Sequence, residues 1–287
     1  AAIRVLDPNV GLKTLDDLGL VGHNKEVVER AIIKPFGMAI LSGPTGSGKT
    51  TTLYALMQQL NKDDVNIVSL EDPVEYTIDG VNQSQVRPDI GYDFASGLRQ
   101  ILRQDPDVIM VGEIRDSETA GLAVNAALTG HIVLSTLHTN NAISVIPRLL
   151  DLKVDAFLLP SSLNLMIAQR LVSRLCDKCK KAEEPTTEVL GIMSKELGKT
   201  LPQNPKIYHA VGCQACNGKG ISGRIALFEI FEMTPQLTEI ISGQINENKL
   251  LEEAKRQGMI TMRQDGLLKV LEGLVSVEEV LRETNEE

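Results

Sequence analysis

Short apolar runs alternate along this chain with longer segments in which apolar residues recur every three or four positions. Runs of four to seven largely apolar residues are typical of strands buried on both faces of a parallel sheet. They occur at Met38–Ser42, Val65–Leu70, Val108–Val111 and His131–Leu137. Because segments with helical periodicity separate them, the pattern predicts an α/β fold in which helices cover a parallel sheet.

Helix-start and helix-stop residues mark the segments between and after these runs. Asp93 is expected to cap one helix, Asp116 or Ser117 another, and Ser276 with Glu279 to form a capping box. The predicted helices are Asn24–Ile33, Thr51–Leu60, Phe94–Gln104, one ending at Ala127, Asp155–Arg174, Pro235–Ile241, Lys249–Gln257, Met262–Glu272 and one after Ser276. The helix expected over Asp155–Arg174 is long and mostly apolar.

The first apolar run leads directly into a glycine-rich turn with the spacing of a P-loop. Its residues are Gly43, Pro44, Thr45, Gly46, Ser47, Gly48, Lys49, Thr50 and Thr51. The glycines allow successive backbone N–H groups to point into one concavity, and the following helix adds its positive end. Lys49 is expected to reach the β- and γ-phosphates of ATP, and the Thr50 hydroxyl to bind Mg²⁺.

Polar side chains follow three of the predicted strands. Glu71, Asp72 and Glu75 come after the second run, Glu113 after the third and His138 after the fourth. Ligands of open α/β sheets lie beyond the carboxyl ends of the strands, so these groups are expected near the nucleotide. Glu113 can orient the water that attacks the γ-phosphate. A solvated acidic loop is the alternative for the first cluster, and a structural histidine for His138.

Arg99 and Arg103 are four residues apart on the predicted helix Phe94–Gln104 and therefore share one of its faces. By themselves they favour ordinary surface charge over phosphate binding.

All four cysteines fall into one pattern, Cys176-x-x-Cys179 and Cys213-x-x-Cys216, with 33 residues between the two pairs. Paired CxxC knuckles are typical of a tetrahedral zinc site that is closed to substrates. Two disulfides are the alternative and require an oxidising compartment.

Composition limits the remaining possibilities. The 287 residues carry a formal net charge of −9, which disfavours nucleic acid as the main partner. No apolar run is long enough to span a bilayer. Because the chain begins without Met and inside an expected strand, Ile3–Leu6, we expect it to be part of a longer polypeptide. The predicted organisation is a remnant of a preceding domain (1–10), a P-loop core (11–174), a four-cysteine zinc subdomain (175–224) and a C-terminal helical domain (225–287).

The motifs together resemble the secretion ATPase superfamily. They are the P-loop, Glu71-Asp-Pro-Val-Glu75-Tyr, Gly112-Glu113-Ile-Arg115-Asp, and the segment from Thr129-Gly-His131 to His138-Thr139, all in order. The paired cysteines resemble the branch that powers type II secretion and type IV pilus extension, whereas pilus retraction motors lack them. The resemblance implies a RecA-like core in a homo-hexamer that hydrolyses ATP with Mg²⁺. It also implies a cytoplasmic protein that is peripheral at the inner membrane through a platform protein.

The resemblance also assigns residues. Glu71, Asp72 and Glu75 match the family's Asp box, Glu113 its Walker B glutamate, and His131 and His138 its His box. Arginines of the family, some of which contact nucleotide within or across subunits, fall at Arg99, Arg103, Arg115, Arg148 and Arg224. Two other functions stay open, a nucleic-acid motor on the same core and a nucleotide-gated switch with negligible turnover.

Overall fold

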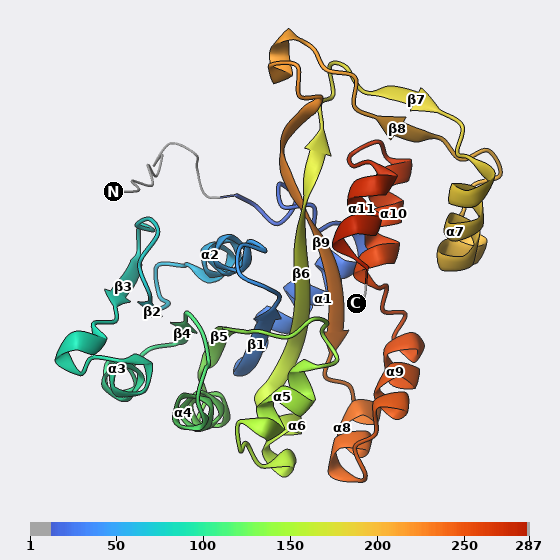
Figure 1. Cartoon of the computed structure of the whole chain (residues 1–287). Coiled ribbons are helices and arrows are strands. Elements are labelled where there is room, and N and C mark those ends of the chain that lie inside the picture. Colours follow the sequence, from blue (N-terminus) through green and yellow to red (C-terminus); the bar gives the residue numbers. More distant parts are fainter. Residues whose placement is uncertain (1–12, 286–287) are drawn as a thin grey trace.

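A seven-stranded sheet runs through the centre of the molecule, which is described over residues 13–285 of a computed structural model (Figure 1). The strand order is β3-β2-β4-β5-β1-β6-β9, and all neighbouring pairs are parallel except β6 and β9. The strands are β1 Gly37–Ser42, β2 Ile67–Glu71, β3 Val81–Gln85, β4 Val108–Val111, β5 Ile132–Leu137, β6 Leu163–Leu175 and β9 Ile221–Glu232. The predicted α/β fold with a parallel sheet is confirmed, and each of the four predicted runs forms a strand. The expected strand Ile3–Leu6 lies outside the described residues.

Helices cover both faces of the sheet, which explains why β1, β2 and β4 are buried along their whole length. On one face, α1 Gly22–Ile32 and α2 Lys49–Leu60 share a hydrophobic core with the strands. The opposite face is covered by α3 Phe94–Ile101, α4 Ser117–Leu128, α5 Val145–Asp151 and the single turn α6 Leu159–Ser162. Asp93 and Asp116 cap α3 and α4, as predicted.

The predicted helix Asp155–Arg174 is wrong, because most of it is the strand β6. Only a 3₁₀ turn at Ala156–Leu158 and the turn α6 are helical. The segment contains leucine, methionine, alanine, glutamine and arginine, which have high helix propensity, and an apolar run buried on both faces does not reveal its period. Pairing with β1 on one side and β9 on the other determines its conformation.

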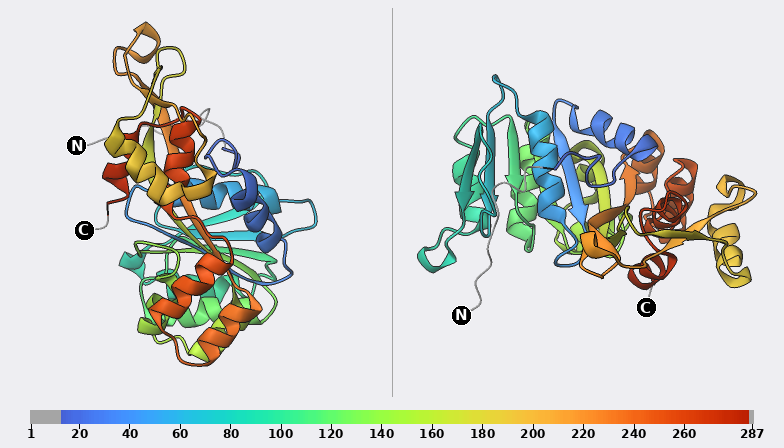
Figure 2. Two further views of the ribbon diagram at one scale, coloured as in Figure 1. Left: turned by 90° about the vertical axis from the view of Figure 1, so that its right-hand side faces the viewer. Right: turned by 90° about the horizontal axis from the view of Figure 1, so that it is seen from above.

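The far ends of β6 and β9 continue past the sheet as a two-stranded ribbon that leads into the cysteine-containing segment (Figures 1 and 2). Beside it lie the short strands β7 Lys181–Glu183 and β8 Ile207–His209, and the helix α7 Thr187–Leu197. The sequence predicted a domain boundary between residues 224 and 225, and β9 runs across this point. The division into domains stays a prediction.

Four helices follow β9: α8 Pro235–Ser242, α9 Glu247–Arg256, α10 Met262–Leu271 and α11 Val277–Glu283. They match the four predicted helices. The capping box at α11 is incomplete, however, because the Ser276 hydroxyl accepts from the Glu279 N–H but the Glu279 carboxylate accepts from the Ser173 N–H of β6 instead. Glu279 therefore attaches α11 to the sheet.

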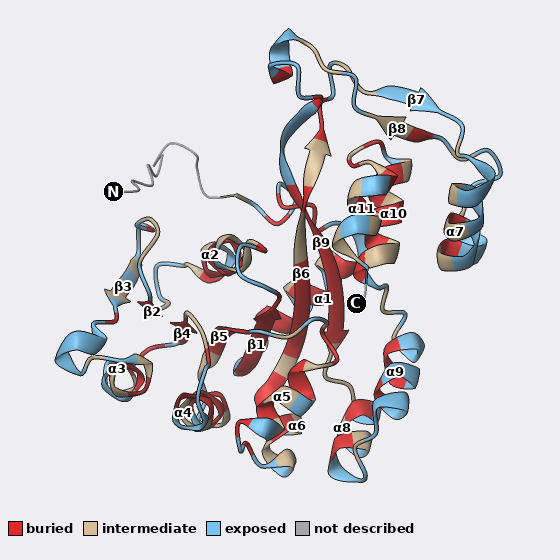
Figure 3. Cartoon of the chain, in the orientation of Figure 1, coloured by how far each residue is buried: buried red, intermediate tan, exposed pale blue. Residues whose placement is uncertain are grey.

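Residues of the central sheet are more buried than those at the periphery of the molecule (Figure 3). The central strands β1, β2, β4 and β5 and the inward faces of the helices are buried. The edge strand β3, the tip of the ribbon and the outer face of α7 are exposed or half-buried. Within residues 13–285, no helix combines the length and apolarity needed to cross a bilayer.

Candidate nucleotide-binding site

The P-loop connects the carboxyl end of β1 to the amino end of α2, as its sequence predicted. Gly48 precedes α2 with φ of +87°, a left-handed conformation that favours glycine. The Lys49 ammonium bends back over the loop and donates to the carbonyl oxygens of Gly43 at 2.8 Å and Pro44 at 3.0 Å. The lysine thus lies where a phosphate held by the loop would be within its reach.

Burial changes the acid–base properties of Lys49. Loss of solvent around the ammonium lowers the pKa of Lys49, and the charge of Glu113 partly opposes this effect. The opposing effect means that Glu113 and Lys49 lie within electrostatic reach of each other although they are 64 positions apart. Thr50, the predicted Mg²⁺ ligand, begins α2 next to Lys49 and is exposed.

A buried polar atom of the loop lacks a partner. Ser47 is 3% exposed, and its hydroxyl makes no hydrogen bond with any described residue. Buried hydroxyl groups are normally hydrogen-bonded, so a free one is consistent with a site that binds a polar ligand. The P-loop residues therefore fit a phosphate-containing ligand.

Gln169 of β6 lies directly against the P-loop. Its amide Nε2 donates to the Ser47 carbonyl oxygen at 2.8 Å, and its Oε1 accepts from the Thr52 hydroxyl of α2 at 2.7 Å. A Cβ atom at Gly43 would lie 2.5 Å from the Gln169 carbonyl oxygen, and one at Gly48 would lie 2.9 Å from its Nε2. These two glycines are needed because β6 approaches the loop so closely.

Glu113 follows β4, and an arginine and a histidine lie next to its carboxylate. Arg115 forms a salt bridge with one of its carboxylate oxygens, and His138 Nε2 lies 3.4 Å from the other. The Glu113 side chain is 14% exposed, so the carboxylate is largely shielded from bulk water. Glu113, Arg115 and His138 therefore form one cluster beyond the carboxyl ends of β4 and β5. The sequence predicted this position for Glu113 and His138.

Glu71, predicted as a catalytic carboxylate, ends β2 and is 2% exposed. Its Oε1 accepts from the Ser69 hydroxyl at 2.5 Å and from Gln83 Nε2 at 3.1 Å, and its Oε2 accepts from the Tyr54 hydroxyl. Burial, together with the adjacent Glu71, raises the pKa of Tyr54. The network connects α2, β2 and β3, whereas Asp72, the next residue, is exposed.

The predicted arginines occupy different positions around the site. Arg99 on α3 forms a salt bridge with Glu118 in the first turn of α4. The predicted end of this helix at Gln104 is wrong, because α3 ends at Ile101 and Arg103 lies in the following turn, where it is exposed. Arg148 lies on α5 and Arg224 is exposed on β9.

His131 and His138 lie at opposite ends of β5. His131 precedes the strand, and its Nδ1 is 2.9 Å from the Ala126 carbonyl oxygen at the end of α4. Of the two, only His138 lies at the edge that carries the P-loop and Glu113.

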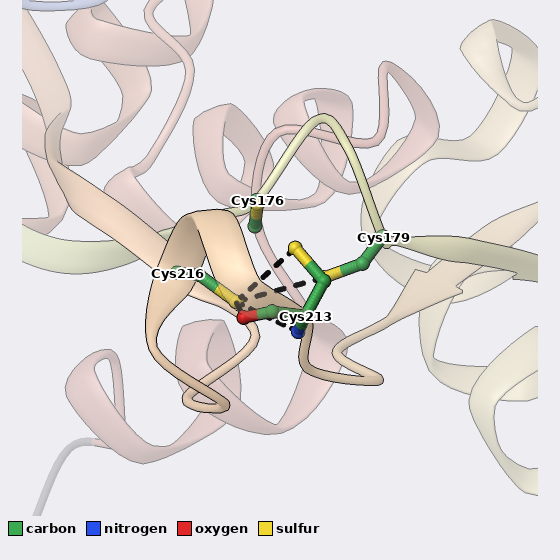
Figure 4. Close-up of side chains that lie close together, drawn as sticks. All are labelled: Cys176, Cys179, Cys213 and Cys216. Carbon is green, nitrogen blue, oxygen red and sulfur yellow. Dashed lines mark hydrogen bonds between the residues drawn. The ribbon is translucent and has the colours of Figure 1, made fainter.

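The four cysteines converge at the tip of the β6–β9 ribbon (Figure 4). Their sulfur atoms all lie within 4.8 Å of one another, and none forms a disulfide. Cys216 Sγ is 3.7 Å from Cys213 Sγ and 3.8 Å from Cys179 Sγ. It also accepts from the N–H groups of Cys213 and Gly220, and the hydrogen bond from Cys213 is the main reason that the pKa of Cys216 is lowered to about 6. The cluster could hold a metal ion.

Sequence reasoning missed Gln169, Tyr54 and Gln83. A signal existed for Gln169, since it is an uncharged amide inside the apolar run Leu163–Leu175, but the run was interpreted as a helix. Tyr54 and Gln83 contact Glu71 from other elements, and no local pattern indicates such contacts.

Comparisons with known proteins agree with this geometry. The family model of the type II/IV secretion system protein matches residues 1–282. The chain is 46% identical to the type II secretion system ATPase E of Vibrio cholerae, over 99% of this chain and 56% of that protein. It is 45% identical to the type IV pilus assembly ATPase PilB of Pseudomonas aeruginosa, over 99% of this chain and 50% of that protein. The chain thus spans about half the length of these relatives.

Solved structures give the same result for the fold. The pilus retraction motor PilT with bound ADP superposes with a TM-score of 0.71 and 29% identity, over 99% of this chain and 69% of that one. The ATPase DotB of Legionella pneumophila superposes with a TM-score of 0.67 and 25% identity, over 93% and 64% of the two chains. From its sequence and its fold alike, the chain belongs to the type II/IV secretion system protein family.

Proposed function

We propose that this chain is the ATP-hydrolysing part of a motor that powers type II protein secretion or type IV pilus assembly. The observation that carries the proposal is the position of Lys49 on the P-loop, within electrostatic reach of Glu113 at the same edge of the sheet. A phosphate-binding loop and a shielded carboxylate at this edge are the two parts that nucleotide hydrolysis requires.

Each residue of the site has a proposed role. The backbone of residues 43–48 and the amino end of α2 bind the phosphates, and Lys49 neutralises charge on the β- and γ-phosphates. The Glu113 carboxylate orients the attacking water, and Arg115 and His138 hold that carboxylate in place. The catalytic role of Glu71 stays a prediction. The three hydrogen bonds that its carboxylate accepts instead favour a role in positioning the segment that begins at Asp72.

Two metal ions are part of the proposal. Thr50 would contribute a hydroxyl to Mg²⁺, which neutralises phosphate charge. The four cysteine thiolates would hold a structural Zn²⁺. A tetrahedral site with Zn–S bonds of about 2.3 Å places its sulfurs about 3.8 Å apart, and the two sulfur distances at Cys216 are 3.7 and 3.8 Å. All four positions are filled by the chain, so this metal would support the ribbon tip and take no part in catalysis.

Assembly is inferred from the relatives and from the arginines. We expect a homo-hexamer with a RecA-like core in each subunit, bound at the cytoplasmic face of the inner membrane through a platform protein. Exposed Arg103 and Arg224 are available to a neighbouring subunit, and the cysteine cluster favours secretion or pilus assembly over pilus retraction. The negative net charge disfavours the nucleic-acid motor.

Nucleotide binding and phosphate release test the proposal directly. The chain should bind ATP with Mg²⁺, and Lys49→Ala should weaken binding and abolish hydrolysis because it removes the cation facing the phosphates. Lys62→Ala is a matched control, since Lys62 is an exposed lysine just beyond the opposite end of α2. Equal nucleotide affinity in the Lys49→Ala and Lys62→Ala variants would contradict the assignment.

A further inference from the structure

We propose that Gln169 is a positioning residue of the nucleotide site, which holds the P-loop in its phosphate-binding conformation from the neighbouring strand β6. The inference rests on the proposed function and deepens it. Gln169 lies outside the P-loop motif, and 119 positions separate it from Thr50.

Both polar atoms of the Gln169 side chain, Nε2 and Oε1, are hydrogen-bonded. Its Nε2 donates to the Ser47 carbonyl, inside the P-loop, and its Oε1 accepts from Thr52, in the first turn of α2. The side chain therefore connects the loop to the helix whose positive end the phosphates need. Gln169 and Thr52 are both fully buried, so water cannot replace either bond.

Close packing strengthens the constraint. The backbone of Gln169 approaches Gly43, the first residue of the loop, and its side chain approaches Gly48, the last glycine before Lys49. Contacts at both ends of the loop leave it little freedom to change its shape independently of β6. A buried amide that loses its partners leaves polar groups unsatisfied, so the native arrangement is strongly favoured over alternatives.

Through its position on β6, Gln169 also connects the P-loop to β9. Gln169 pairs with Phe228 of β9, and both strands continue into the ribbon that carries the cysteine cluster. In the same region Glu229 of β9 accepts from the Ala142 N–H, in the segment after β5 and His138. The paired strands β6 and β9 thus contact both the P-loop and the segment that follows His138.

The test compares two amides on the same strand. Gln169→Met keeps nearly the same volume but removes both hydrogen bonds. Asn164→Leu is the matched control, because Asn164 Nδ2 also donates from β6 to a backbone carbonyl, that of Phe36, at the opposite end of β1. Both variants are expected to be less stable to heat, but only Gln169→Met should alter the P-loop.

Hydrogen exchange of the nucleotide-free chain measures the P-loop directly. Gln169→Met should increase exchange of the amides of residues 43–52 by about tenfold or more, whereas Asn164→Leu leaves them unchanged. In nucleotide titrations with a fluorescent ADP analogue, Gln169→Met should raise Kd by about tenfold. Unchanged exchange in residues 43–52 would overturn the inference, whether or not nucleotide binds.

Failure of the proposed function and failure of the inference about Gln169 give different results. If the unmodified chain binds no nucleotide, the proposed function fails, while the exchange experiment still decides the role of Gln169. If Gln169→Met does not fold, Thr52→Val removes one of the two bonds and should increase exchange over the same residues to a smaller extent. Wild-type exchange in Thr52→Val would then overturn the inference.

Discussion

Arg115 forms a salt bridge with Glu113, two residues before it, in the segment that follows β4. The pairing holds the carboxylate at the edge of the sheet where Lys49 bends over the P-loop. His138 approaches the other carboxylate oxygen from the end of β5. Glu113 is therefore oriented by neighbours from two strands, which suits a group that must hold a water molecule in a defined direction.

Exchanging this carboxylate for an amide separates binding from hydrolysis. Glu113→Gln keeps the size of the side chain but cannot accept a proton from the attacking water, so phosphate release should fall about a hundredfold or more. ATP affinity should change little, because the P-loop is intact. Steady-state phosphate release and equilibrium ATP binding measure the two effects, and loss of ATP binding in a folded variant would assign Glu113 a structural role.

Arg103 is exposed beyond α3, and we expect it to act on the nucleotide of a neighbouring subunit. Arg103→Ala should then lower the ATPase activity of the assembled protein without reducing ATP binding to dilute chains. Mixing Arg103→Ala with Glu113→Gln should restore activity, because some interfaces combine Glu113 from one chain with Arg103 from the other.

A control mixture makes this result specific. Lys49→Ala and Glu113→Gln both affect the site of their own chain, so each chain keeps one defect and mixing them should restore nothing. If the Arg103→Ala mixture also stays inactive, and specific activity does not rise with protein concentration, Arg103 acts within its own chain or only supports the fold.

The cysteine cluster should contain one zinc per chain. Because metal binding at such a site contributes to the folding of its surroundings, Cys213→Ser should destabilise the ribbon tip more than the P-loop core. Metal analysis gives the stoichiometry, and hydrogen exchange compares residues 175–224 with residues 43–52. A metal-free native protein with two disulfides, or equal destabilisation of both regions, would contradict this prediction.

Acid should weaken the packing of α8 against α9 through Glu253. This buried carboxylate accepts from both Nε and Nη2 of Arg256 and from the Thr234 hydroxyl, and the bonds from Arg256 are the main reason that its pKa is lowered to about 2. A pKa lowered by folding from 4.5 contributes stability that is fully present above about pH 5 and is lost as the pH falls towards 2.

Glu253→Gln should therefore reduce the free energy of unfolding at neutral pH and flatten its dependence on pH between 5 and 2. Glu252→Gln is the matched control, because Glu252 is the adjacent exposed carboxylate on α9. Chemical unfolding across this pH range measures both, and an identical slope in the two variants would exclude Glu253 as a source of acid sensitivity.

The sequence by itself determined the elements that depend on local chemistry. The glycine spacing of residues 43–48 predicts a P-loop because only this backbone can present successive N–H groups to phosphate. The apolar runs that became β1, β2, β4 and β5 were recognisable because short strands buried on both faces are mostly apolar. The spacing of the cysteines also predicted that their sulfurs would come together.

Tertiary structure decided what depends on distant partners. Residues 163–175 have good helix formers, yet they form β6 because hydrogen bonds to β1 and β9 outweigh a local preference worth only a fraction of a kcal/mol per residue. The same pairing brings Gln169 to the P-loop, across a separation that no sequence pattern reveals. In the sequence, Glu71 belongs to a cluster of acidic residues. In the structure it is buried, and its carboxylate accepts hydrogen bonds from Tyr54, Ser69 and Gln83. These outcomes follow from long-range pairing and desolvation, which depend on the folded arrangement and which local sequence patterns do not specify.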